Sequence, residues 1–350
     1  MSRSPHLSAR PLGYRNNEKQ ISDSITGAVS VYLEKERLAH MKAVITGATG
    51  AIGMALISEL VKRDIEVLAL CRPNSGRNSR LESFGPMVKT AACDISELHA
   101  FTPAAGEKYD YFFHFGWAGT TGAARNDMFM QNKNVKYTLD AVELASRFGC
   151  SVFIGAGSQA EYGRVEGKLS DKTPTAPENG YGIAKLCAGR MSRIMCASLG
   201  MKHVWARILS VYGPYDNEVS MVISTLRKMI NGEETEFTPG EQIWDYMYSE
   251  DAAAAILAIA ERGVDGNVYC IGSGEAVMLK DYITKMRDAA NPACEPGFGK
   301  RPYAEGQVMY LSADTEKLKA DTGFEPKWSF EDGIAKTVAW LKADMAKDTK

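Results

Sequence analysis

Tyr181 and Lys185 stand four residues apart, a spacing that places both side chains on one face of a helix. A phenol with an ordinary pKa of about 10 is a poor base at neutral pH, but a nearby ammonium group favours the phenolate. Lys185 is therefore expected to lower the pKa of Tyr181 and prepare it for proton transfer. The pair alone is a weak signal, since fifteen tyrosines give about one such pair by chance. The alternative is a core tyrosine beside a solvated lysine.

A glycine-rich loop runs from Gly47 to Gly53 and reads Gly-Ala-Thr-Gly-Ala-Ile-Gly. Glycines at this spacing allow a tight turn, close approach of the backbone to a pyrophosphate, and close packing of a helix on a strand. The helix that follows would offer unpaired N–H groups to the phosphates. Because a strand-like run precedes the loop, the pattern predicts dinucleotide binding rather than an ordinary turn. The residues expected to bind are Gly47, Thr49, Gly50, Ala51, Ile52 and Gly53.

Short apolar runs are expected to form the strands that position these residues. They cover 43–46, 66–71, 88–93, 109–115, 151–156 and 203–208. Segments with helical spacing lie between them, at 53–63, 135–147 and 181–198. Continuously apolar strands that alternate with helices indicate parallel pairing with helices on both faces. The fold class is therefore α/β, a doubly wound parallel sheet of the Rossmann type with its ligands at the carboxyl ends of the strands.

The length of 350 residues favours two lobes. We expect an NAD(P)-binding domain over 41–209 and mainly a smaller substrate-binding lobe over 210–350, with part of 244–272 returning to the first domain. Residues 1–40 lack a strong period over most of their length. They are expected to be a disordered arm, or to precede a natural start at Met41. Their acidic residues argue against a targeting peptide.

Composition argues against several classes of protein. Lys and Arg number 41 against 43 Asp and Glu, which gives no general electrostatic reason to bind nucleic acid or an anionic membrane. No apolar run approaches the ~18 residues of a membrane helix. The seven cysteines include no C-x-x-C pair, which argues against a zinc site or a disulfide framework. We expect a cytoplasmic protein without a metal, nucleic acid or membrane partner.

The order of these and further motifs resembles the extended short-chain dehydrogenase/reductase family of nucleotide-sugar epimerases, dehydratases and reductases. The similarity extends from Lys42 to about Leu341. Besides the glycine loop it rests on Asp94-Ile95, Phe113-His114-Phe115-Gly116, Asn134-Val135, Ser158 with Tyr162-Gly163, Tyr212-Gly213-Pro214 and Ile271-Gly272-Ser273-Gly274.

The resemblance implies that Ser158, Tyr181 and Lys185 are the catalytic residues. Ser158 would hydrogen-bond the reacting sugar oxygen, Tyr181 would exchange a proton with it, and Lys185 would bind the ribose of the cofactor. Hydride would move to or from the nicotinamide. Further implied cofactor contacts, besides Tyr181 and Lys185, are Asp94, Ile95, Phe115, Gly116 and Asn134.

Two features of the sequence narrow the choice of reaction within the family. Gln159 and Ala160 follow Ser158 where the family's 4,6-dehydratases carry an Asp-Glu pair as acid and base, so the sequence argues against dehydration. Arg72 ends the second strand where NAD-specific members usually have an acidic residue, and it offers a cation to a 2′-phosphate. This predicts NADP(H) as the cofactor, with NAD(H) as the alternative. The other explanation of Arg72 is a solvated basic loop that does not bind the cofactor. Since reductases consume NADPH and epimerases recycle bound NAD, a reductase is favoured.

Residues 240–248 resemble a segment of the CDP-abequose and CDP-paratose synthases, which reduce a 4-keto sugar. Expected substrate contacts are Trp117, Ser158, Gln159, Ser210 and Trp244. Ser210 stands where an Asn is common in relatives, and Trp244 where many have an Arg. Trp244 would either stack on the nucleotide base or serve as a core aromatic.

The leading hypothesis is an NAD(P)-dependent reductase for the 4-keto group of a nucleotide-activated 4-keto-6-deoxy or 3,6-dideoxy sugar, with Tyr181 as proton donor. The alternatives are an NAD-dependent 4-epimerase similar to UDP-glucose 4-epimerase, and a non-enzymatic NAD(P) sensor, which would not need the catalytic residues. The apolar faces of 135–147 and 181–198 suggest a homodimer, as in relatives, although burial on the sheet would explain them equally well.

Overall fold

The computed structural model describes residues 41–348, so the arm expected for residues 1–40 lies outside the described residues. Seven parallel strands form the main sheet in the order β10-β6-β5-β4-β1-β2-β3. The strands are β1 (Lys42–Thr46), β2 (Glu66–Cys71), β3 (Val88–Ala92), β4 (Tyr111–His114), β5 (Val152–Ser158), β6 (Lys202–Ile208) and β10 (Val268–Ile271). The predicted doubly wound parallel sheet is confirmed. The strand order reverses between β1 and β4, where such sheets bind ligands.

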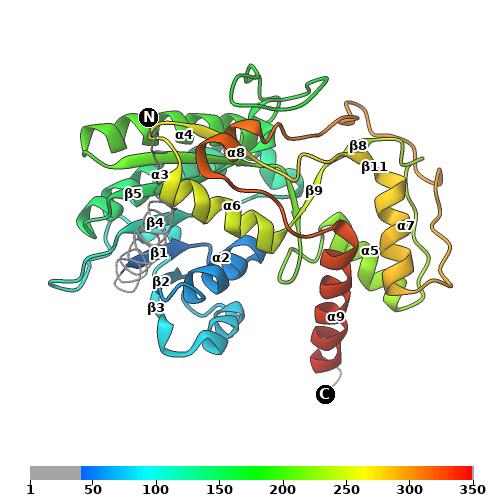
Figure 1. The fold of residues 1–350 in the computed structure, drawn as a ribbon, viewed down its shortest axis with the longest axis horizontal. Helices are drawn as coiled ribbons and strands as arrows, with labels where there is room; N and C mark the ends of the chain where they lie inside the picture. Colours follow the sequence, from blue (N-terminus) through cyan, green and yellow to red (C-terminus); the bar gives the residue numbers. More distant parts are fainter. Residues whose placement is uncertain (1–40, 349–350) are drawn as a thin grey trace, which may run out of the picture.

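Helices cover both faces of this sheet (Figure 1). They include α2 (Ala51–Val61) and α6 (Ser249–Arg262) on one face, and α3 (Met128–Arg147) and α4 (Gly180–Ser198) on the other. Alternate strand residues point to opposite faces. Accordingly, Ala43 and Ile45 of β1 belong to the core with α2 and α6, whereas Val44 packs with α3.

Helix α3 begins seven residues before the expected Val135. The carboxylate of Asp127 accepts a hydrogen bond from the Met130 N–H at 3.0 Å and caps the helix there. Four 3₁₀ segments complete the described part of this lobe, and the first of them is interrupted by a kink at Gly85. They are η1 (Gly76–Met87), η2 (Ile95–Glu97), η3 (Gly122–Asn126) and η4 (Gln159–Glu161).

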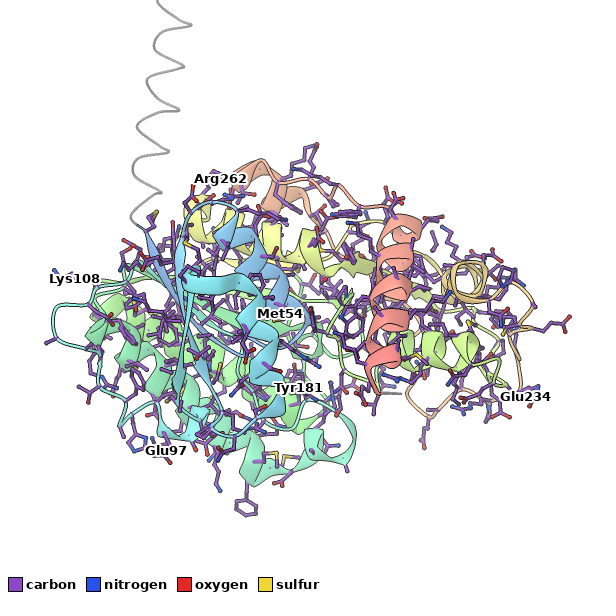
Figure 2. All side chains as sticks on the ribbon, turned by 90° about the horizontal axis from the view of Figure 1, so that it is seen from below. Met54, Glu97, Lys108, Tyr181, Glu234 and Arg262 are labelled. Atoms are coloured by element: carbon purple, nitrogen blue, oxygen red, sulfur yellow. The ribbon has the colours of Figure 1, made fainter. Side chains whose placement is uncertain are left out.

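A second, smaller lobe has its own hydrophobic core, which includes Ile223, Ile283 and Ile334. These residues come from α5 (Met221–Ile230), α7 (Leu279–Ala290) and α9 (Phe330–Asp348). Its short strands are β7 (Ser210–Tyr212), β8 (Ile243–Trp244), β9 (Tyr246–Tyr248) and β11 (Val277–Met278), while α8 (Glu316–Thr322) packs on α6. Figure 2 shows the two lobes side by side, with Lys108 at the far end of the first and Glu234 at the far end of the second. No helix within residues 41–348 is long and apolar enough to cross a membrane.

Candidate active site

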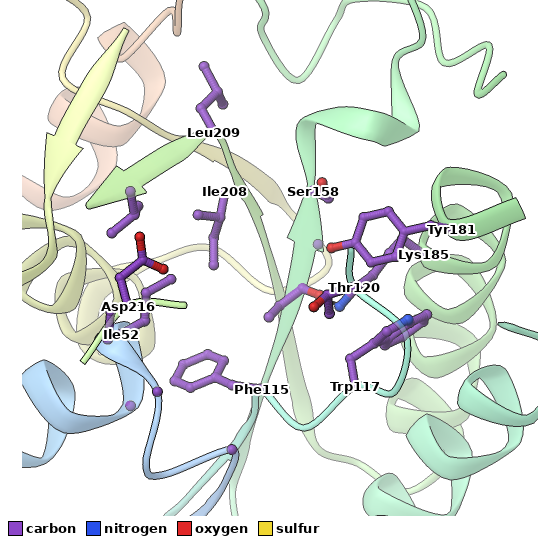
Figure 3. Close-up of a pocket in the computed structure, with 17 residues that line it drawn as sticks. Ile52, Phe115, Trp117, Thr120, Ser158, Tyr181, Lys185, Ile208, Leu209 and Asp216 are labelled. Atoms are coloured by element: carbon purple, nitrogen blue, oxygen red, sulfur yellow. The ribbon is translucent and has the colours of Figure 1, made fainter. Parts of the chain in front are cut away.

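A cavity of about 330 Å³ lies beyond the carboxyl ends of β1, β5 and β6 (Figure 3). It brings together Ser158 at the end of β5, Tyr181 and Lys185 on α4, and the glycine loop after β1. Of the other residues predicted for the site, Ile52, Phe115 and Trp117 also line it. Segments that are far apart in the sequence thus converge at the place that a doubly wound sheet provides for a ligand.

The glycine loop fits a dinucleotide pyrophosphate. A Cβ at Gly53 would lie 2.4 Å from the carbonyl oxygen of Gly47, and one at Gly47 would lie 2.7 Å from Phe115, so a side chain at either position would clash with backbone. A Cβ at Gly50 would meet no protein atom closer than 3.9 Å. The α2 N-terminus at Gly50 has no side-chain cap and no acidic residue in its first turn, which leaves its N–H groups available to phosphate.

A second cavity of about 450 Å³ continues from the first and shares Gly47, Gly50, Phe115 and Trp117 with it. Its walls contain the other residues predicted for the adenosine half of the cofactor. Arg72, Asp94 and Ile95 are these residues, and Thr49 of the glycine loop and Gly116, two further predicted cofactor contacts, line the same walls. The two cavities adjoin at the glycine loop, and together they are called the cofactor channel below.

Arg72 and Asp94 form an ion pair in this channel, with Nε 3.2 Å from Oδ2. Burial acts to raise the pKa of Asp94, but hydrogen bonds from Ser96 and the charge of Arg72 hold it below its ordinary value. The Arg72 side chain is nevertheless 73% exposed. Its guanidinium therefore keeps donors available for an anionic group of a ligand.

Tyr181 lies in the first turn of α4, which Asn179 caps by accepting a hydrogen bond from the Gly182 N–H at 2.8 Å. Burial raises the pKa of the phenol, while a hydrogen bond with Ser158 and the charge of Arg125 act to lower it. The Arg125 guanidinium lies 4.3 Å from the ring centroid. Sequence reasoning missed this arginine, because η3 brings it to α4 from 56 residues earlier in the chain.

The expectation that Lys185 lowers the pKa of Tyr181 is wrong for this structure. The Lys185 Nζ donates to the Ala156 carbonyl oxygen at 2.6 Å, and it lies 3.7 Å from the Trp117 ring centroid but 5.7 Å from that of Tyr181. Burial lowers the pKa of Lys185 itself to about 7, although Glu161 opposes the shift. A lysine that is losing its own proton near neutral pH is a weak source of positive charge.

The stability of the ligand-free protein is expected to depend on this titration. The folded state releases the Lys185 proton near pH 7, whereas an unfolded lysine holds it to about pH 10.4. The unfolded state then binds more protons between these values, so the free energy of unfolding should rise with pH across that window, by on the order of a few kcal/mol. Urea unfolding of wild type and Lys185→Met between pH 6 and 10 measures this. Parallel curves for the two proteins would contradict it.

Ser158 is fixed by Glu161, a second residue to which sequence reasoning gave no role in the site. The Glu161 carboxylate is fully buried and accepts hydrogen bonds from the Ser158 N–H at 2.9 Å, the Trp205 Nε1 at 2.9 Å and the Arg207 Nε at 2.7 Å. With the Ser158 hydroxyl it forms a capping box for η4. The spacing Ser-x-x-Glu was the available signal, since that pattern is typical of such a box.

Four predicted contacts do not line either cavity. Asn134 is buried and hydrogen-bonds both backbone groups of Ala118 at 2.9 Å, so it positions the loop with Trp117 rather than facing the cofactor channel. Ser210 accepts a hydrogen bond from the Trp244 indole at 2.8 Å, and Trp244 packs on the core around Tyr162. Gln159 lies in η4, outside the lining of both cavities. The core interpretation of Trp244 is therefore the one the packing favours.

A third residue outside the sequence predictions, Asp216, lines the first cavity from the second lobe. Burial raises the pKa of its carboxyl, against hydrogen bonds from Ser220 and the Asn217 N–H. Asp216 is four residues beyond Tyr212 of the Tyr-Gly-Pro motif, and nothing in the local sequence indicates that the loop turns it towards Ser158. Within residues 41–348, no group of three or more His, Cys, Asp or Glu side chains is arranged to hold a metal ion.

Comparison with known proteins agrees with this geometry. Residues 43–272 match the model of the NAD dependent epimerase/dehydratase family. The sequence is 23% identical to an uncharacterized UDP-glucose epimerase, YtcB, of Bacillus subtilis, over 87% of this chain and 98% of that protein. It is 25% identical to a dTDP-glucose 4,6-dehydratase of Actinoplanes over 87% and 99% of the two chains.

Solved structures share the fold. A UDP-glucose 4-epimerase of Thermotoga maritima with UDP-glucose superimposes with a TM-score of 0.78 at 23% identity, covering 87% of this chain and 100% of that one. A UDP-N-acetylglucosamine 4-epimerase of Methanobrevibacter ruminantium also gives 0.78, at 21% identity, covering 87% and 99%. The agreement extends over both lobes, since nearly the whole of each of these chains is covered.

Proposed function

Because the chain belongs to the NAD dependent epimerase/dehydratase family, we propose that it is an NAD(P)-dependent enzyme that acts on a nucleotide-activated sugar. The observation that carries this is the convergence of Ser158, Tyr181 and Lys185 on a cavity continuous with a pyrophosphate cradle. Similar proteins are named as enzymes of UDP-glucose and dTDP-glucose, which agrees with such a substrate.

The proposed chemistry is oxidation or reduction at a sugar carbon that bears oxygen. The bound nicotinamide supplies the site that accepts or donates hydride. The Tyr181 hydroxyl gives a proton to the sugar oxygen, or takes one from it, at its Oη atom. The Ser158 hydroxyl, held beside Tyr181 by their hydrogen bond, orients the same oxygen. Arg125 over the Tyr181 ring favours the phenolate that remains when the proton has left.

The buried hydrogen bonds of the Glu161 carboxylate argue against dehydration of the sugar. Both of its carboxylate oxygens are occupied by buried donors, and the residue has no exposure to solvent. Gln159 and Ala160, which take the places of the dehydratase acid and base, have no group to exchange a proton at neutral pH. We therefore favour simple reduction of the 4-keto group of a nucleotide-activated 4-keto-6-deoxy or 3,6-dideoxy sugar.

NADP(H) is the proposed cofactor of this reductase, because Arg72 and Arg77 line the adenosine end of the channel. Replacing Arg72 by alanine is expected to weaken NADPH binding about 10- to 100-fold through loss of charge-assisted hydrogen bonds to a phosphate. NADH binding should change little. Titration calorimetry with both dinucleotides measures the effect, and Lys62→Ala, which removes an exposed cation at the far end of α2, is the control. An equal loss for NADH would refute the 2′-phosphate assignment.

A 4-epimerase is the second candidate, supported by the similarity to named UDP-glucose epimerases along nearly the whole chain. One experiment distinguishes the reductase from the epimerase. Freshly purified protein is denatured, any released dinucleotide is identified, and the binding of NADPH and NADH to the empty protein is then measured. Near-stoichiometric NAD would favour the epimerase. An empty protein that prefers NADPH and oxidises it with a 4-keto sugar nucleotide would establish the reductase, and binding of neither dinucleotide would refute both.

We further propose a homodimer formed through α3 and α4, which pack side by side. Phe129 is 85% exposed and Ile194 70% exposed, and Met128, Ile183 and Met191 are exposed on the same two helices. Exposed apolar side chains on neighbouring elements are typical of protein–protein interfaces. Sedimentation velocity tests the association, with Phe129→Asp expected to shift the protein towards monomer.

A further inference from the structure

The active-site cavity contains a charged residue that the proposed chemistry does not use. Among the 17 residues that line it, Lys185 is the one basic residue and Asp216 the one acidic residue. Lys185 belongs to α4 in the first lobe, whereas Asp216 comes from the segment between β7 and α5 in the second. Figure 3 shows Asp216 on the side of the cavity opposite Tyr181, with the polar atoms of both directed into the space between them.

The chain holds Asp216 in this place by a strained turn. Tyr215 has φ of 66°, a left-handed conformation that residues other than glycine seldom adopt. Its ring is held by Trp340 at 5.2 Å and by the Arg80 guanidinium at 5.1 Å, which compensate for the strain. The Asn217 N–H donates to Asp216 Oδ1 at 2.7 Å. Contacts from both lobes thus fix the direction of a single carboxyl group.

Asp216 has no cationic partner among the residues that the structure describes. Burial raises the pKa of Asp216, and hydrogen bonds from the Ser220 side chain and the Asn217 N–H lower it. No positively charged group within residues 41–348 contributes to the pKa. The carboxyl group therefore faces the cavity with acceptor capacity to spare. A partly buried acceptor is stabilised by donors that a ligand brings.

The required ligand group is a hydrogen-bond donor. Phosphate oxygens at neutral pH are acceptors and carry negative charge, so this wall of the cavity repels them. Sugar hydroxyl groups are donors, and a carboxylate can accept from two neighbouring ones. The hexose of a sugar nucleotide and the ribose of the cofactor both offer such hydroxyls. The hexose is the better match, because Asp216 faces Tyr181, where the sugar must react.

We infer that Asp216 is a specificity-determining residue that accepts hydrogen bonds from hydroxyl groups of the substrate sugar. The inference rests on the proposed function, and it assigns to the second lobe a direct part in choosing the sugar. A site built to hydrogen-bond a hydroxyl discriminates against sugars that lack it, since its own polar group is then left unpaired.

Asp216→Asn tests this, because the amide keeps the shape of the side chain and replaces an acceptor by a donor. Glu218→Gln is the matched control, an exposed acid two residues further along the same loop. Binding is measured by titration calorimetry with UDP-, dTDP-, CDP- and GDP-glucose, with the matching nucleoside diphosphates, and with NAD and NADPH. For the sugar nucleotide that wild type binds, D216N should weaken binding about 10- to 100-fold. Binding of the diphosphate and of the dinucleotides should stay within about twofold.

The outcomes are distinct. Equal weakening for the sugar nucleotide and its diphosphate would place Asp216 near the nucleotide and overturn the inference, as would unchanged binding of both. Weakening of the dinucleotides alone would assign the carboxyl group to the cofactor ribose and overturn it as well. If wild type binds neither the sugar nucleotides nor the nucleoside diphosphates, the proposed function falls, and the inference falls with it. Binding of a diphosphate that its glucose derivative does not share would overturn the inference alone. Loss in E218Q equal to that in D216N would show a general effect of charge.

Discussion

Replacement of Tyr181 by phenylalanine is expected to lower turnover by about 10²- to 10⁴-fold, the contribution usual for a positioned acid or base. The variant loses only the hydroxyl group that faces Ser158, in a buried position at the start of α4. The glycine loop at Gly47–Gly53 lines the same cavity as that hydroxyl, but its backbone and the walls around Arg72 would hold the dinucleotide through other groups. Dinucleotide affinity should therefore remain nearly unchanged. Steady-state oxidation of the nicotinamide cofactor and calorimetric binding measure the two quantities.

Tyr303→Phe is the control for this variant, because it removes a phenol hydroxyl that bonds Glu241 at 3.3 Å and lines neither cavity. It should turn over like wild type. Unchanged turnover in Tyr181→Phe would refute the role of Tyr181 in proton transfer. A variant that fails to bind the dinucleotide would instead show that the phenol supports the architecture of the channel.

Loss of the Glu161 carboxylate is expected to destabilise the fold strongly. Its ion pair with Arg207 is buried, with side-chain exposures of 1% and 7%. Glu161→Leu would leave a buried guanidinium without its partner, and would also leave the Ser158 N–H and the Trp205 indole without an acceptor. Removal of one member of such a pair costs about 3–5 kcal/mol. Urea unfolding of the variant should show a loss of that order in the free energy of unfolding.

Two further variants separate the charge effect from other causes. In Glu161→Leu/Arg207→Met the unpaired charge is gone, so part of the lost stability should return. Glu178→Gln breaks the exposed ion pair with Arg164, whose side chains are 48% and 54% exposed, and little change is expected there. Wild-type stability in Glu161→Leu, or a double variant less stable than Glu161→Leu, would contradict this account of the pair.

The positions of the strands were accessible from the sequence because they depend on local periodicity. Runs such as 66–71 are continuously apolar, since both faces of a central parallel strand are covered by helices, and β2 has those same limits. The glycine loop was equally readable, because a tight turn and close backbone packing leave no room for a Cβ at Gly47 or Gly53. The start of α3 could not be predicted from the sequence. The cap at Asp127 adds two helical turns, and the exposed Met128 and Phe129 in them depart from the expected pattern of buried apolar residues.

The sequence by itself determined the Rossmann-type sheet, the glycine loop and the candidate trio of Ser158, Tyr181 and Lys185. Each of these depends on a short sequence pattern, in which the spacing of the residues determines the local backbone structure. The tertiary structure decided what surrounds them. Arg125 over Tyr181, Arg207 on Glu161 and Asp216 across the cavity are pairings between distant segments. Burial then set the protonation of Lys185, because desolvation depends on the atoms packed around a group and not on its neighbours in the chain.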